Sequence, residues 1–225
     1  MRTKKGVAAV ICVIVVLVGI VCAGLLKDFD AAGYVSAILD QRFQGEVASA
    51  AEIIEDTDES ELMRQYEEGI ESFVADHITN GVDVDEELER KFVNLCKEIF
   101  RTMKYSVGEA EKISRKEYDV KVEFQPVDIF QQFITAIAVE SQQLKDKAEN
   151  GEYKGTKDEI NQQMQTEFLN NSYELLKESY QNMQYGEAET MVFKVESDET
   201  NAFSLKEEDI SSFITKILGL DEIQD

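Results

Sequence analysis

The feature that most constrains this chain is an apolar run near its N-terminus. Residues 6–26 contain no charged side chain. As an α-helix they would be about 30 Å long, which matches the hydrocarbon core of a bilayer. Basic side chains precede the run at Arg2, Lys4 and Lys5, whereas acidic residues begin directly after Lys27. The positive-inside rule therefore predicts a single-pass transmembrane helix, with the N-terminus in the cytoplasm and the C-terminal domain outside the cell.

Three fates are open for this segment. It can remain as an uncleaved signal anchor, which its length favours. It can be lipidated at Cys22, although Gly19 and Val21 stand where a lipobox has leucine and a small residue. It can also be cut after Ala23, where a loose small-x-small pattern occurs. The first two fates leave the remaining domain attached to the membrane, and the third releases it.

We therefore divide the chain into residues 1–27, the cytoplasmic tip and anchor, and residues 28–225, an extracytoplasmic domain. The second part is long enough for one buried core or for two small halves. The chain carries 46 acidic and 23 basic residues, for a net charge of −23. Because phosphate backbones repel such a surface, we expect no nucleic-acid partner. The acidity suits solubility, a basic partner or a cation.

Helical periodicity recurs along the domain. Apolar side chains at spacings of three and four predict helices over residues 31–43, 58–77, 85–103, 128–148, 158–183 and 210–218. The apolar stripe predicted for the fourth helix is Phe130, Phe133, Ile134, Ile137, Ser141 and Leu144. We expect these stripes to face a common core.

Between the helices the period changes to two. Residues 107–113 and 118–124 alternate apolar and polar side chains, which predicts a β-hairpin that Pro126 ends. Residues 188–195 and 202–205 are candidates for a third and a fourth strand. The expected fold class is α+β, with long amphipathic helices packed on a small antiparallel sheet of three or four strands. A cystatin-like or NTF2-like arrangement, with a helix cradled by a curved sheet, is a specific variant.

Two segments of the chain resemble each other. Each follows a long helix and opens a strand, and each contains the sequence GEAE, at residues 108–111 and 186–189. This predicts an internal duplication with halves 28–126 and 127–220, for which chance similarity is the alternative.

The sequence offers no recognisable catalytic site, so we assign no catalytic and no cofactor-binding residue. His77 is the only histidine, which excludes a multi-histidine metal site, and it suits a helix C-terminus. Cys96 lies on an apolar helix face, as a buried thiol would. Acidic clusters at residues 55–59 and 83–87 suit either helix capping or weak Ca²⁺ binding. The glycine-rich segment 151–157 lacks the spacing of a phosphate loop and is expected to be a turn.

Several segments carry a resemblance to a known family. They are residues 27–39 (KDFDAAGYVSAIL), 104–110 (KYSVGEA), 118–126 (YDVKVEFQP) and 203–209 (FSLKEED). Together with the charged N-terminus and the apolar run, they resemble an uncharacterised family of lipoproteins and membrane-anchored proteins on the surface of Gram-positive bacteria. The resemblance implies a location at the cell surface and no particular reaction.

The leading functional hypothesis is a non-enzymatic protein-interaction module, tethered to the membrane through residues 6–26, whose partner is an envelope or extracellular protein. We expect no cofactor. One alternative is a module that binds a small ligand or a cation such as Ca²⁺. Another is a cell-envelope hydrolase that uses paired carboxylates.

Overall fold

The computed structural model describes residues 21–22, 29–54, 57–79, 81–82, 84–199 and 202–220. Its elements in chain order are β1 (Val21–Cys22), α1 (Ala31–Gln44), α2 (Ala48–Ile53), α3 (Glu59–Phe73), the π-helical turn η1 (Val74–Ile78), α4 (Glu86–Arg101), β2 (Lys104–Lys112), β3 (Glu117–Gln125), α5 (Ile129–Glu149), α6 (Lys157–Gln181), β4 (Glu189–Ser197), β5 (Ala202–Leu205) and α7 (Glu207–Ile217).

The predicted membrane anchor falls almost entirely outside the described residues. Val21 and Cys22 form β1, which pairs antiparallel with β5, so these two residues are extended where the predicted anchor is helical. The rest of 6–26 is not described. Among the helices that are described, none is both long and apolar enough to cross a bilayer. The anchor, its cleavage after Ala23 and the lipidation of Cys22 therefore stay predictions.

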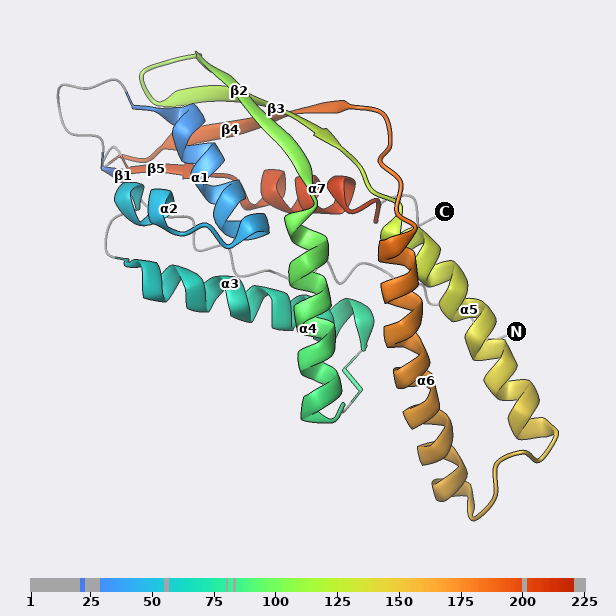
Figure 1. Ribbon diagram of the computed structural model, residues 1–225. Helices are drawn as coiled ribbons and strands as arrows, with labels where there is room; N and C mark the ends of the chain where they lie inside the picture. The colour runs from blue at the N-terminus through green and yellow to red at the C-terminus, as the bar shows by residue number, and fades with distance from the viewer. Residues whose placement is uncertain are drawn as a thin grey trace, which may run out of the picture. The chain divides into compact units, whose positions relative to one another are not determined.

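The α+β fold class is confirmed. The strands form one sheet in the order β1-β5-β4-β3-β2 (Figure 1). β4 and β5 pair antiparallel, with Val195 opposite Leu205 and Ser197 opposite Phe203. β2 and β3 form the predicted hairpin, which is closed by the Ile113 N–H donating to the Glu117 carbonyl at 3.0 Å. β3 ends at Gln125, directly before Pro126, as the missing proline N–H dictates.

The chain forms two compact units whose segments alternate along the sequence. Unit 1 comprises residues 1–82, 105–124 and 190–214, and unit 2 comprises 83–104, 125–189 and 215–225. A long helix precedes a strand in both places where GEAE occurs, as α4 precedes β2 and α6 precedes β4. The GEAE segment at 108–111 lies inside β2, however, whereas the one at 186–189 reaches β4 only with Glu189. The duplication itself stays a prediction.

In unit 1, one face of the sheet is buried by aromatic packing. Phe213 of α7 is fully buried, and its ring centroid lies 5.1 Å from that of Phe124 on β3 and 5.3 Å from that of Phe193 on β4. Phe43 of α1 lies 5.9 Å from the Phe213 ring and 5.7 Å from the Tyr105 ring on β2. α1 and α7 therefore cover the same face of the sheet (Figure 1).

α1 is buried on nearly all sides because α2 and α3 pack on it as well. Ala37 of α1, Ala50 of α2 and Leu62 of α3 share one buried cluster. The buried side chain of Gln41 donates to the Leu62 carbonyl at 3.1 Å, which satisfies a polar group inside this core. Gly45 ends α1 at φ 69°, in the left-handed conformation that glycine adopts most easily.

The opposite face of the sheet is polar. Lys121 and Glu123 of β3 alternate with the buried residues Val120, Val122 and Phe124. Lys194 of β4 pairs with Glu117 of β3 at 3.5 Å, and Lys206, directly after β5, pairs with Glu196 of β4 at 2.8 Å. Period-two alternation thus separates a covered face from a charged one, as the sequence predicts.

In unit 2, α6 packs along α5 as an antiparallel helical hairpin and also contacts α4 (Figure 1). The edge of Phe92 on α4 meets the ring of Tyr173 on α6, with centroids 5.6 Å apart. The hairpin is joined at its base to the end of α7 through the Val127 N–H, which donates to the Ile217 carbonyl at 3.0 Å. Gly219 has φ 62°, and a Cβ there would lie 2.6 Å from the Val127 carbonyl, so a larger residue would not fit.

The structure departs from the sequence-based expectations in three places. α2 was not predicted, and the helix predicted to end at His77 finishes with a π-helical turn. The assignment of Ile134 to a core stripe is wrong, because its side chain is 42% exposed. α5 packs on α6 over a narrower sector than the apolar pattern suggests, and Ile134 lies outside that sector.

The Phe213 cluster predicts a large effect on stability. Phe213→Ala is expected to lower the free energy of unfolding by about 3–5 kcal/mol, because it leaves a cavity among four aromatic rings. Urea titration followed by circular dichroism measures this. The control Val192→Ala, on the exposed face of β4, should change it by about 0.5 kcal/mol at most. Equal effects of the two substitutions would contradict the central role of Phe213.

Candidate functional site

The far end of the α5–α6 hairpin is held by local hydrogen bonds. α5 ends at Glu149 and α6 begins at Lys157, so a short turn joins them. Thr156 caps α6: its Oγ1 accepts from the Glu159 N–H at 3.4 Å, and Oε2 of Glu159 accepts from the Thr156 N–H at 2.7 Å. This reciprocal capping box satisfies two N–H groups that helix formation leaves unpaired. The expected turn at 151–157 is confirmed.

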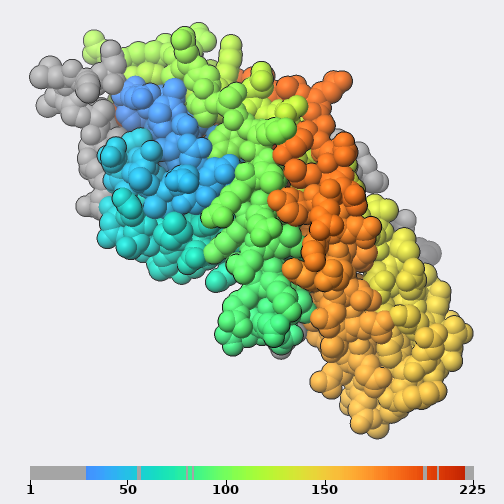
Figure 2. All heavy atoms as spheres, viewed as in Figure 1, coloured from blue at the N-terminus to red at the C-terminus, as the bar shows by residue number. Residues whose placement is uncertain are grey.

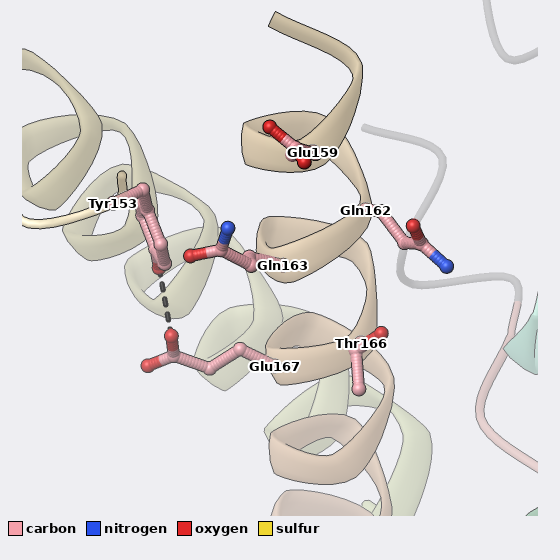
Figure 3. A pocket seen from close by; sticks show the side chains of 6 residues that line it. All are labelled: Tyr153, Glu159, Gln162, Gln163, Thr166 and Glu167. Atoms are coloured by element: carbon pink, nitrogen blue, oxygen red, sulfur yellow. Dashed lines mark hydrogen bonds between the residues drawn. The ribbon is translucent and has the colours of Figure 1, made fainter. Parts of the chain in front are cut away.

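Beside this turn lies a pocket of about 560 Å³ (Figure 3). Tyr153, Glu159, Gln162, Gln163, Thr166 and Glu167 line it. The last five residues project from one sector of α6 at helical spacing, while Tyr153 comes from the turn. Figure 3 shows Tyr153, Gln163 and Glu167 close together on one side of α6, whereas Gln162 and Thr166 project on the side of the helix away from Tyr153.

Glu167 organises one wall of this pocket. Its Oε1 accepts from the Lys147 ammonium of α5 at 2.5 Å, and its Oε2 accepts from the Tyr153 hydroxyl at 2.8 Å. The hydrogen bond from Lys147 is the main reason that the pKa of Glu167 is lowered, and the bond from Tyr153 acts in the same direction. Glu167 therefore stays ionised at neutral pH and fixes the position of the Tyr153 ring.

The other lining groups are uncharged or already engaged. The Gln163 amide donates to the Lys154 carbonyl at 2.8 Å, which orients its carbonyl oxygen. Hydrogen bonds from Thr156 lower the pKa of Glu159 and engage its Oε2. Within the described part of the chain, the side chains of Gln162 and Thr166 make no hydrogen bond. The pocket thus offers amides, a hydroxyl, an aromatic ring and Oε1 of Glu159.

A second feature of the hairpin is an uncharged surface on α5, which we call the α5 patch. It consists of the exposed residues Ile134, Thr135, Ala138 and Val139. Val139 is 56% exposed and Ile134 is 42% exposed. Figure 2 shows α5 and α6 in contact along the hairpin. The first eleven residues of α5 include no charged side chain, on a chain of net charge −23.

The residues singled out by sequence have structural roles. Cys96 is completely buried in α4, and burial raises the pKa of its thiol to about 12, so it is not a nucleophile at neutral pH. His77 lies in the last turn before the end of η1, with its ring 4.8 Å from that of Phe73. Partial burial lowers the pKa of His77, which favours the neutral imidazole. The position of Cys96 agrees with a buried thiol, and that of His77 agrees with a residue at a helix C-terminus.

One side chain from each acidic cluster caps a helix N-terminus. Asp58 accepts from the Glu61 N–H at 2.9 Å at the start of α3, and Asp85 accepts from the Leu88 N–H at 3.0 Å at the start of α4. Asp83 lies outside the described residues. Over the part of the chain that the structure describes, no group of three metal-ligating side chains occurs. The capping interpretation is confirmed for Asp58 and Asp85.

Glu159 and Glu167 are two carboxylates in one pocket, but they do not suit glycoside hydrolysis. Eight residues along one helix separate them by about 12 Å, whereas such pairs lie about 5–9.5 Å apart. A general acid also needs a raised pKa, and hydrogen bonds lower the pKa of both groups. This pair therefore supplies no acid–base couple.

No protein-family model matches the chain, and no curated protein matches it. A solved structure is similar to the chain in fold. It is that of YcdA, a candidate lipoprotein from Bacillus subtilis subsp. subtilis str. 168. The TM-score is 0.52 at 16% sequence identity, and the alignment covers 84% of this chain and 56% of YcdA. The two proteins share a fold. This chain spans little more than half the length of YcdA.

The sequence did not predict the pocket, because one of the residues that line it comes from a turn. Tyr153 follows no periodic pattern, and the α6 stripe of Glu159, Gln163 and Glu167 is polar, so it indicates only a solvated face. A usable signal was present in Thr156-x-x-Glu159, the pattern of a capping box, which fixes where α6 begins.

The Lys147–Glu167 contact predicts a measurable pKa change. Lys147→Met is expected to raise the pKa of Glu167 toward the ordinary glutamate value, because the strongest hydrogen bond to the carboxylate is lost. NMR titration with ¹³C-labelled glutamate measures this pKa. Lys177→Met is the control, because Lys177 pairs with Glu174 instead. An unchanged Glu167 pKa in Lys147→Met would show that the contact is not formed.

Proposed function

We propose that this chain is a non-enzymatic interaction module, held at the outer surface of the cell membrane by its N-terminal segment, which binds another envelope protein through the α5 patch. The observation that carries the proposal is the exposure of Ile134 and Val139 on an uncharged stretch of helix. Exposed apolar surface on an otherwise charged protein commonly marks a protein-binding site.

The proposed partner offers an apolar helical segment or groove from a different protein. Two copies of this chain each carry a net charge of −23, so self-association would bring like charges together. On α5 the patch is followed by polar residues such as Gln142, Lys145 and Asp146. A small apolar centre beside a polar border is typical of protein interfaces. Helices commonly dock through residues spaced three and four apart, as in this patch.

The proposed location rests on two observations. Basic residues precede the apolar run 6–26 and acidic residues follow it, which favours export of the C-terminal part. The described residues share their fold with a candidate lipoprotein. Retention as an anchor and lipidation at Cys22 would each attach the domain to the membrane, and the proposal holds for either.

Photo-cross-linking tests the interaction. A photoreactive residue at Val139 of the full-length chain, irradiated in intact cells, is expected to give a discrete adduct with one envelope protein. The matched control is the same residue at Val192, which is 39% exposed on the sheet of unit 1. Ile134→Ser should reduce the Val139 adduct at least threefold without changing the amount of protein. Equal adducts from the two positions, or no effect of Ile134→Ser, would refute the α5 patch as the binding surface.

Labelling of intact cells tests the location. A membrane-impermeant lysine reagent is expected to modify exposed lysines such as Lys121 and Lys154 without cell lysis. The proposed orientation places both outside, while Lys4 and Lys5 stay protected. Mass spectrometry of the labelled peptides measures this. Modification of Lys121 and Lys154 only after lysis would place the domain inside the cell.

A further inference from the structure

We infer that the pocket at the far end of the α5–α6 hairpin is a binding site for a neutral saccharide, with Tyr153 as the wall against which a sugar ring packs and Gln162, Gln163 and Thr166 as its hydrogen-bonding groups. This site is separate from the α5 patch, and the inference does not depend on the proposed protein partner. The pocket has a volume of about 560 Å³ and is open to solvent, so a ligand bound there would keep one side exposed.

The chemistry of the lining selects an uncharged, hydroxyl-rich ligand. Amide side chains both donate and accept, and the Thr166 hydroxyl does the same, which matches the hydroxyl groups of a sugar. Hydrogen bonding to Lys154 directs the Gln163 amide nitrogen away from the ligand and leaves its carbonyl oxygen as an acceptor. In the described part of the chain the side chains of Gln162 and Thr166 have no hydrogen bond to give up when a ligand binds.

The charges of the lining disfavour the other ligand classes. An anion would meet Glu159 and Glu167 on a strongly acidic chain. A cation would have to compete with Lys147 and the Tyr153 hydroxyl for the two oxygens of Glu167, and with Thr156 for Oε2 of Glu159. Both oxygens of Glu167 and Oε2 of Glu159 already serve as acceptors within the hairpin, so the remaining lining consists of neutral groups and Oε1 of Glu159.

The position of the aromatic ring is fixed before any ligand arrives. The hydrogen bond of 2.8 Å from the Tyr153 hydroxyl to Glu167 holds the side chain at its tip, and the Lys147–Glu167 ion pair holds the carboxylate in turn (Figure 3). A ring held in this way loses little conformational entropy on binding, which lowers the cost of association. Its face is apolar and can pack on the C–H groups of a pyranose, while the amides bind the hydroxyls.

The test uses the full-length chain in a detergent without sugar groups. The probes are a tetramer of N-acetylglucosamine and maltotetraose, with a tetramer of galacturonic acid as the anionic control, followed by saturation-transfer NMR and calorimetry. At least one neutral tetramer is expected to bind, and the anionic one is not. Gln162→Ala and Tyr153→Ala are each expected to weaken binding at least tenfold, whereas Tyr153→Phe, which keeps the ring, should weaken it less.

Gln165→Ala is the matched control, because Gln165 is an exposed glutamine of α6 that does not line the pocket, and it should leave the affinity unchanged.

Co-sedimentation with insoluble cell-wall glycan separates two sources: binding to tetramers alone indicates a free oligosaccharide, and binding to both indicates an envelope polymer. Failure of both neutral tetramers to bind at about 10 mM, which corresponds to an affinity weaker than about 3 kcal/mol, would overturn the inference. Binding that Gln162→Ala and Tyr153→Ala leave intact would overturn it as well. Val139→Ser should not alter saccharide binding, so a failed protein interaction is distinguishable from a failed saccharide site.

Discussion

The burial of one sheet face under aromatic side chains is the interaction on which unit 1 depends. Phe213 of α7 meets rings from α1, β3 and β4, so a single side chain joins elements far apart in the sequence. Each buried phenylalanine contributes about 1.5–3 kcal/mol, and edge-on aromatic pairs add about 0.5–1.5 kcal/mol each. Because α1 and α7 cover this face of the sheet, Lys121, Glu123 and Lys194 lie on the other face. The alternation in β3 and β4 follows directly from that arrangement.

Unit 2 is stabilised differently, and this difference leaves surface available. α5 and α6 contact each other along their length, and their turn is fixed by the capping box of Thr156 and Glu159 rather than by a large apolar core. The polar contacts of Glu167 tie the turn to both helices. Since folding of the hairpin needs only the facing sectors of the two helices, the outer sector of α5 and the polar stripe of α6 are free to carry other functions.

The sequence predicted most elements because each depends on a local pattern. The end of α1 at Gly45, the hairpin of β2 and β3, and the stop at Pro126 follow from left-handed glycine, period-two alternation and the missing proline N–H. The apolar spacing predicted the long helices.

The sequence did not predict α2, because its six residues are too few for a period to show. Ile134 was assigned to the core because spacing indicates which residues share a face, whereas the neighbouring helix decides how much of that face is covered. The pocket could not be predicted, because the turn between α5 and α6 brings Tyr153 beside α6 and no local sequence pattern indicates this.

The burial of Cys96 has a consequence for where this protein can exist. A thiol with no exposed surface and a pKa of about 12 is neither ionised nor accessible to oxidants at neutral pH. The packing around α4 therefore needs no disulfide, and Cys96 keeps the same covalent form in the reducing cytoplasm and in an oxidising exterior. A chain that is made on one side of a membrane and exported to the other can thus retain the same folded core without help from thiol-oxidising enzymes.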